Sequence, residues 1–202
     1  TYGKGNTGLA DGLKTIAAHI KSAKKRGETQ PRALLVPEGG KNLLQIAKLL
    51  AGFGLSTNDV RLLGSGQWDE PALTRNKRLF GSWFASAAPD QRNVFNKHFK
   101  KTYGYEPVRI ASLTYDAMSL VGYISAAGRG FSDSTLINER GVAGVDGIFR
   151  FGPDRVAERA LAVLEIIPNN VELVDNPPTA FTQFYGGSQP AASTPAVAAP
   201  AH

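Results

Sequence analysis

The sequence predicts an α/β fold built on a parallel, helix-covered sheet. Short apolar runs, too brief to be helices, alternate with longer segments whose apolar residues recur at helical spacing. Two later runs flank a Gly-Pro-Asp turn and add an antiparallel hairpin to this sheet. The three early apolar runs are "ALLV" at 33–36, "VRLLGSG" at 60–66 and "LFGSWFAS" at 79–86.

The first part of the chain supplies two helices around the first strand. Residues 6–26 form an amphipathic helix, and a second helix at 41–53 stops at Gly54. The run at 33–36 is wholly apolar, so we expect a strand buried on both faces. The residues that face inward are Leu9, Leu13, Ile16, Ala17, Ile20 and Ala23 in the first helix, and Leu43, Leu44, Ile46, Ala47 and Leu50 in the second.

The later elements follow from turn residues and patterning. A helix begins at Pro89–Asp90 and ends at Gly104. Residues 109–127 are apolar nearly all round, so we expect a buried helix. Proline, alanine and serine dominate from about residue 176. We therefore expect one α/β domain over 1–167 and a Pro/Ala-rich linker or disordered tail over 168–202.

The charge pattern admits two interpretations. The net charge is +6, and basic residues gather at 21–26, 75–78 and 97–101. Such runs fit a polyanion such as nucleic acid or anionic lipid, or they are solvated helix ends. Residues 21–26 close a predicted helix, where cations suit the helix dipole, and no RNA-binding signature accompanies the runs. We favour helix ends and expect no nucleic-acid partner.

Composition also limits chemistry and location. Cysteine is absent, which rules out disulfides, Cys-ligated zinc and thiol catalysis, and fits an oxidising compartment. No apolar run reaches the roughly 18 residues of a membrane helix. We expect any membrane association to depend on a lipid anchor outside this chain.

Signatures of catalysis and cofactor binding are weak. His19, His98 and His202 are dispersed, so we expect no metal site, and no nucleophile elbow, metalloprotease motif or P-loop is present. Residues 3–8, "GKGNTG", match a dinucleotide fingerprint. That fingerprint needs a preceding strand and an acidic residue about 20 residues on, where the sequence reads "KSAKKRGE". We expect no cofactor and a protein that is not an enzyme.

The best candidate site lies where the first two strands end. In an open α/β sheet, ligands bind at the carboxyl ends of the strands. Glycines there let backbone N–H groups approach a ligand, Trp68 could form a flat apolar wall, and the carboxylates and amide could orient polar groups. The alternative is turn chemistry with a packed tryptophan. The candidate ligand-binding residues are Glu38 and Gly39 after the first strand, and Ser65, Gly66, Gln67, Trp68 and Asp69 after the second.

The order of several motifs resembles the Leu/Ile/Val-binding family of type 1 periplasmic binding proteins. The resemblance covers roughly residues 1–167 and is carried by "RALLVPEGGKNLLQIAKLLAGFGL", "VRLLGSGQWDEPAL", "LFGSWFAS" and "FNKHFKKTYGYEPVRIASLTYDAMSLV". Within that family, "LLGSGQWDEPAL", "ASLTYDAMSL" and "GVDGIFRFGPDRVAERALAVLEI" most resemble bacterial penicillin-binding protein activators. The resemblance implies a bacterial periplasmic or cell-envelope location.

The resemblance also implies function and partners. It implies two hinged lobes that close on a small polar ligand such as an amino acid, for uptake through an ABC permease. An activator would instead regulate a peptidoglycan synthase through protein contacts. Tyr115 and Asp116 would lie near the hinge in a structural role.

Two departures from the family pattern matter. Family members are much longer, so this chain looks like the C-terminal part of a two-lobe protein, mostly the second lobe. Helix 109–127 would then lie towards the hinge and the first lobe. Amino-acid receptors of the family commonly place an acidic residue in the loop after the second of these strands. Here that stretch reads Ser65-Gly66-Gln67, with Asp69 slightly later.

Overall fold

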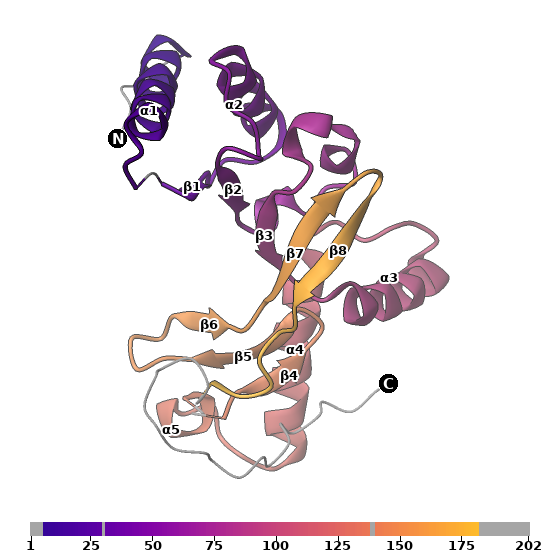
Figure 1. The fold of residues 1–202 in the computed structure, drawn as a ribbon. Coiled ribbons are helices and arrows are strands. Elements are labelled where there is room, and N and C mark those ends of the chain that lie inside the picture. The colour runs from indigo at the N-terminus through magenta and orange to yellow at the C-terminus, as the bar shows by residue number, and fades with distance from the viewer. Residues whose placement is uncertain (1–5, 30, 138–139, 182–202) are drawn as a thin grey trace. The chain divides into compact units, whose positions relative to one another are not determined.

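The computed structural model describes residues 6–29, 31–137 and 140–181, and it divides into two compact units (Figure 1). Of the described residues, the first unit comprises those from 6 to 85 together with Leu164–Val174. The second unit comprises the described residues of Ser86–Val163 and those from 175 to 181. Among the helices of the described part, none combines the length and apolar character needed to cross a bilayer.

The first unit is an α/β layer structure, as predicted. Its sheet has the order β1-β2-β3-β7-β8, and β2 pairs in parallel with both β1 and β3. Three single-turn 3-10 helices follow β2 along the chain. The bounds are α1 Asn6–Arg26, β1 Ala33–Leu35, α2 Gly40–Gly52, β2 Arg61–Gly64, η1 Gly66–Trp68, η2 Leu73–Arg75, η3 Lys77–Leu79, β3 Trp83–Ser86, β7 Ala162–Ile167 and β8 Asn170–Asp175.

The core of this unit lies between the helices and the sheet. Of the five inward positions predicted on α2, Leu43, Ile46, Ala47 and Leu50 are buried, and Leu44 is half-buried. They sit at helical spacing, so one stripe of α2 meets the sheet while its lysines stay in solvent. Further core side chains come from α1 and the strands: Leu13, Ala17, Ile20, Ala23, Leu62, Phe84, Leu164 and Ile166.

The first strand differs from its prediction. We expected residues 33–36 to be buried on both faces, but Leu35 is 69% exposed. The sheet order explains this, because β1 stands at one edge and has a single neighbour, β2. Sequence pattern alone does not separate a central parallel strand from an edge strand of the same composition.

The second unit packs helices on a small antiparallel sheet. The sheet has the order β4-β5-β6. Leu120 and Ile124 of one helix bury against Phe149 of the central strand. The bounds are α3 Pro89–Tyr103, α4 Ala111–Ala126, α5 Asp133–Leu136, β4 Val142–Gly144, β5 Gly147–Phe151 and β6 Ala157–Arg159.

Helix α3 confirms the predicted start and stop signals. Pro89 opens the helix, where its missing N–H costs no hydrogen bond. Gly104 ends the helix in the left-handed conformation with φ 81°, and its N–H donates to the Lys100 carbonyl at 2.8 Å. Glycine adopts this conformation without the Cβ clash that other residues incur.

Helix α4 is not buried all round, which corrects the prediction for 109–127. Its inner face carries Leu120 and Ile124 against the small sheet. Other apolar side chains face solvent, and Met118 is 63% exposed. Within the described residues, one face of α4 is covered, whereas the sequence has apolar residues around most of the helix. The exposed apolar residues of α4 are Leu113, Tyr115, Met118 and Val121.

The predicted late hairpin exists, but it does not join the parallel sheet. Strands β5 and β6 flank the Gly152-Pro153-Asp154 turn and pair antiparallel. We expected the apolar run at 160–164 to form the second strand of this hairpin, but the strand that pairs with β5 after the turn is β6, at Ala157–Arg159. Strands β5 and β6 belong to the three-stranded sheet, and after Arg159 the chain passes to β7 in the five-stranded sheet. The apolar run at 160–164 is therefore split between a connection and a new strand, which periodicity alone does not show.

The boundary of the predicted tail also requires correction. Residues 170–175 form β8 instead of a linker. Asn169 takes φ 60°, a conformation that asparagine tolerates in tight turns, so β7 folds back into β8. Its N–H donates to the Thr74 carbonyl at 2.9 Å, which anchors the turn. The predicted tail over 182–202 lies outside the described residues.

Candidate functional site

Two loops meet at the carboxyl ends of β1 and β2. The strands are parallel, so the loops at 37–40 and 64–69 leave the sheet at the same edge. Helix α2 begins directly after the first loop, and its N-cap residue is Gly39, which is extended and has no side chain that could cap the helix. As at the start of any α-helix, the first backbone N–H groups of α2 have no partner within the helix.

Trp68 joins the two loops from the inside. Its indole Nε1 donates to the Glu38 carbonyl at 2.8 Å. The ring is 1% exposed and lies against Gly64, where an added Cβ would come within 2.1 Å of it. The expectation that Trp68 presents a flat wall to a ligand is therefore wrong. The packed tryptophan that we gave as the alternative is what the structure shows, and its function is to hold the loops.

Gly39 brings the same loops into close contact. A Cβ at this position would lie 2.9 Å from the Cβ of Gln67 and 3.1 Å from its backbone carbonyl. The backbone at Gly39 is extended, so its conformation does not require glycine. Glycine is required at this position because the second loop approaches it closely. From the sequence, we expected the loop glycines to let the backbone approach a ligand. At Gly39, the closest neighbour is Gln67 of the other loop.

The polar side chains of the two loops have different exposures. Gln67 is exposed, and Ser65, Gly66 and Asp69 are half-buried on the same short segment. The half-buried Glu38 accepts a hydrogen bond from Asn42 Nδ2 at 2.9 Å, which orients it over the first turn of α2. The edge thus offers two carboxylates, an amide, a hydroxyl and the start of a helix. Such a set can hydrogen-bond a small polar molecule.

No metal centre accompanies these groups in the described part of the chain, where no three histidine, aspartate or glutamate side chains cluster suitably. The polar groups of this edge can form hydrogen bonds and charge pairs. The sequence identified both loops, because small and polar residues followed two apolar strands.

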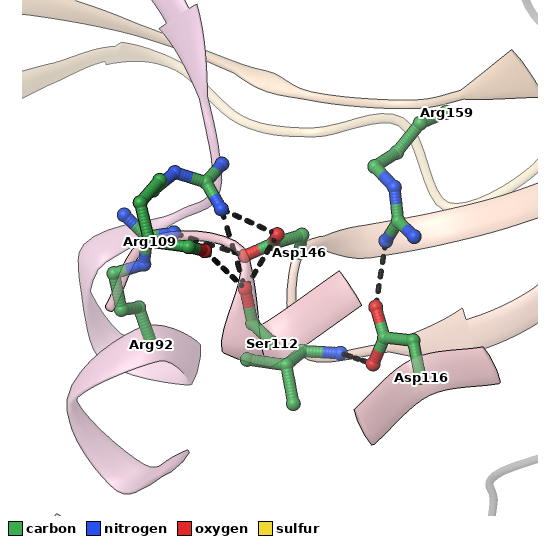
Figure 2. A network of polar contacts seen from close by, with 7 residues as sticks. Arg92, Arg109, Ser112, Asp116, Asp146 and Arg159 are labelled. Atoms are coloured by element: carbon green, nitrogen blue, oxygen red, sulfur yellow. Dashed lines mark hydrogen bonds and ion pairs between the residues drawn. The ribbon is translucent and has the colours of Figure 1, made fainter. Parts of the chain in front are cut away.

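A second constellation, in the second unit, was missed by sequence reasoning. Figure 2 shows Asp146 enclosed by Arg92, Arg109 and Ser112. Its side chain is 0% exposed, and it accepts from Arg109 at 2.8 Å, Ser112 Oγ at 2.9 Å and Arg92 at 3.3 Å. Burial by itself raises the pKa of Asp146, but the hydrogen bonds from Arg109 and Ser112 and the charges of both arginines outweigh burial. The net effect lowers the pKa below its ordinary value.

Asp116 lies beside this cluster and has its own partners (Figure 2). One carboxylate oxygen accepts from Arg159 and the other from the Val145 N–H, both at 2.7 Å. Its neighbour Tyr115 is turned outward and packs its ring 5.3 Å from that of Phe95. These contacts connect α4 to β6 and to the turn between β4 and β5. They are contacts within the protein, and the structural role near a hinge that we expected for Tyr115 and Asp116 stays a prediction.

The signals for this cluster in the sequence are faint. Asp146 sits in "GVDG", which reads as a turn, and its arginine partners are 54 and 37 residues away. Isolated arginines on helices usually face solvent. The buried network becomes visible once the chain has folded.

Sequence comparisons give no relative. No family model matches the chain, and no curated protein sequence is significantly similar to it.

Solved structures do resemble the chain. A protein from Rhodospirillum rubrum, described as a branched-chain amino acid ABC transporter, aligns with a TM-score of 0.61 at 20% identity over 79% of this chain. The leucine-binding protein LivK from Thermotoga maritima aligns at 0.51, with 21% identity over 78%. LpoA from Haemophilus influenzae aligns at 0.52, with 15% identity over 80%.

The chain covers only part of the length of each of these proteins. The chain spans 48% of the Rhodospirillum rubrum protein, 47% of LivK and 29% of LpoA. Identity is below 25% in each case, so the likeness shows the fold alone.

Proposed function

We propose, from the type 1 periplasmic binding protein fold that these likenesses show, that the chain is part of a non-enzymatic binding module. Its ligand is a small polar molecule such as an amino acid. The ligand contacts the loops at 37–40 and 64–69, and the complete protein encloses it between two lobes. The structural neighbours are solute-binding proteins of ABC transporters and LpoA, which are periplasmic or envelope-associated proteins.

One observation carries this proposal: the loops after two parallel strands meet and are fixed together. The hydrogen bond from Trp68 to Glu38 and the contact of Gly39 with Gln67 hold them. Polar groups on rigid loops lose little conformational freedom when a ligand binds, so more of the interaction contributes to affinity. The arrangement lies at the sheet edge where open α/β sheets bind ligands.

The charges of the site suit a ligand with both signs. Carboxylates at Glu38 and Asp69 can accept hydrogen bonds from an ammonium group. A carboxylate of the ligand can accept hydrogen bonds from backbone N–H groups at the start of α2, next to Glu38. An amino acid carries both groups. During uptake, the binding module would pass the amino acid to an ABC permease. Any association with the membrane would depend on a lipid anchor outside this chain.

A second candidate has its own observation. LpoA, which belongs to the penicillin-binding protein activators, shares the fold over 80% of this chain. In addition, the indole of Trp68 is buried and offers a ligand no aromatic surface. A regulator of peptidoglycan synthesis would act through protein contacts and need no transported ligand.

The first experiment is a ligand panel on the complete protein. Amino acids, small peptides and cell-wall fragments are screened by thermal shift, and hits are titrated by calorimetry. A ligand at about 100 times its Kd adds roughly 2.7 kcal/mol to the free energy of unfolding, which a melting shift detects. A hit supports the solute-binding proposal. Silence across the panel, with a peptidoglycan synthase captured from an envelope extract, supports the regulator.

Two variants locate the site. Gln67→Ala and Asp69→Asn each remove one polar contact and should raise the Kd about tenfold. Glu172→Gln on the exposed strand β8 removes one charge away from the loops and serves as the control. A hit whose Kd is the same in the Gln67 and Asp69 variants as in the control would place the ligand elsewhere.

A further inference from the structure

A cavity lies at the end of α2 opposite the proposed polar site. Its volume is about 320 Å³. Helix α2 starts at the carboxyl edge of the sheet, so its last turns reach the amino edge, where Val60 precedes β2. The apolar walls come from α2, from the loop after it and from β2: Ala47, Leu50, Ala51, Leu55, Val60 and Leu62.

Two cations stand at the cavity. Lys77 and Arg78 line it from η3, and both are exposed to solvent. The side chain of Asn76 accepts a hydrogen bond from the Arg78 backbone N–H at 3.0 Å and caps η3, so this bond holds the backbone that carries both cations. The remaining lining residues, Ser56 and Thr57, carry hydroxyls, so no lining residue is acidic.

The acidic residue close by in sequence is already bonded. Asp59 accepts from Lys24 at 3.0 Å and from the Ser56 N–H and hydroxyl at 3.0 and 2.9 Å. These bonds, led by the one from Lys24, lower the pKa of Asp59. An anion entering the cavity therefore meets two cations and apolar walls. The Asp59 carboxylate nearby in sequence is bonded to Lys24 and Ser56.

We propose that this cavity binds a small amphiphile with an alkyl body and one carboxylate. The alkyl chain lies against the α2 and β2 side chains, where it leaves water. The carboxylate lies at the mouth and accepts hydrogen bonds from Lys77 and Arg78. A volume near 320 Å³ is at the small end for ligand cavities and restricts the chain to a short one. This site shares no residue with the loops at 37–40 and 64–69.

Octanoate is the probe, titrated by calorimetry into the complete protein. Octanol has the chain without the charge, and acetate has the charge without the chain. Each should bind at least about tenfold more weakly than octanoate, because each lacks one of the two interactions. Equal affinity for octanol would overturn the proposal, because Lys77 and Arg78 would then not bind the carboxylate. Absence of binding heat with octanoate would also overturn it.

Variants place the probe in this cavity. The double variant Lys77→Gln/Arg78→Gln should raise the octanoate Kd at least about tenfold. Ala51→Phe fills the cavity from its exposed rim and should abolish binding. Lys48→Gln, an exposed cation of α2 that does not line the cavity, is the matched control and should bind like wild type. Octanoate binding that survives both the double variant and Ala51→Phe overturns the proposal, and the double variant decides alone if Ala51→Phe does not fold.

Discussion

Trp68 shows how one residue can support a site without touching a ligand. The indole fills the space over Gly64 and donates to the Glu38 carbonyl, so it connects the core to both candidate loops. From the sequence, we expected the same residue either to face a ligand or to pack in a turn. Its burial shows that it packs, and a large side chain in a packed interior cannot be removed without leaving a void.

Trp68→Ala should lower the free energy of unfolding by about 3–5 kcal/mol, the usual range for a buried aromatic residue. Trp68→Phe keeps most of the apolar volume but leaves the Glu38 carbonyl without its donor, and should cost about 1–3 kcal/mol. Urea unfolding followed by far-UV circular dichroism measures both. Wild-type stability in the alanine variant would contradict the interior position of the ring.

Asp146 makes a pH-dependent contribution to stability. Its folded pKa is lowered, so the contribution is fully present above the unfolded pKa of about 3.9 and is lost as the pH falls through the folded pKa. Unfolding free energies measured between neutral pH and strongly acidic pH should fall most steeply in that acidic window. Asp146→Asn should flatten this part of the profile.

At neutral pH, Asp146→Asn should also cost about 3–5 kcal/mol, because it leaves the arginines around it without their buried partner. Asp175→Asn changes an exposed carboxylate and is the control. An identical pH profile in wild type and Asp146→Asn would show that the network does not depend on this charge.

At the scale of single elements, two glycines of the second unit should respond oppositely to alanine. Gly104 ends α3 with φ 81°, so Gly104→Ala forces a side chain into the left-handed region and should cost about 1–2 kcal/mol. Gly122 lies inside α4 with open space around it, so Gly122→Ala should gain up to about 1 kcal/mol in stability. Thermal melts of both variants test this. A shift of the melting temperature in the same direction for both would contradict the assigned conformations.

The elements that sequence reasoning placed well are those with strong local signals. Helices α1, α2 and α3 have apolar stripes or clear end residues, and their bounds agree closely with the predictions. Strand β8 has weak local signals and depends on β7 and the Asn169 turn, so it was assigned to the tail. The loops of the candidate site were found because they follow recognisable strands. The Asp146 network was not, because its members come from separate elements.

At the scale of the whole molecule, the exposed side of α4 tests whether the chain is part of a two-lobe protein. In this 202-residue chain, Met118→Gln changes an exposed side chain and should alter stability by less than about 0.5 kcal/mol. In the complete protein we expect a larger loss, because the other lobe would cover this face. Urea unfolding of both forms measures the difference.

Leu120→Ala is the matched control for that comparison. Leu120 is buried against Phe149 within this chain, so its loss should cost about 2–5 kcal/mol in both forms. If Met118→Gln were equally mild in the complete protein, the proposed cover over α4 would be refuted.

The sequence by itself determined the α/β class, three helices with their ends, the parallel sheet and the two loops after its first two strands. These features depend on local spacing and turn chemistry, which residues a few positions apart already contain. Tertiary structure decided the edge position of β1, the separate β4-β5-β6 sheet, the burial of Trp68 and the enclosure of Asp146 by two arginines. Each of these joins residues distant in the chain, and their burial follows from which elements pack together.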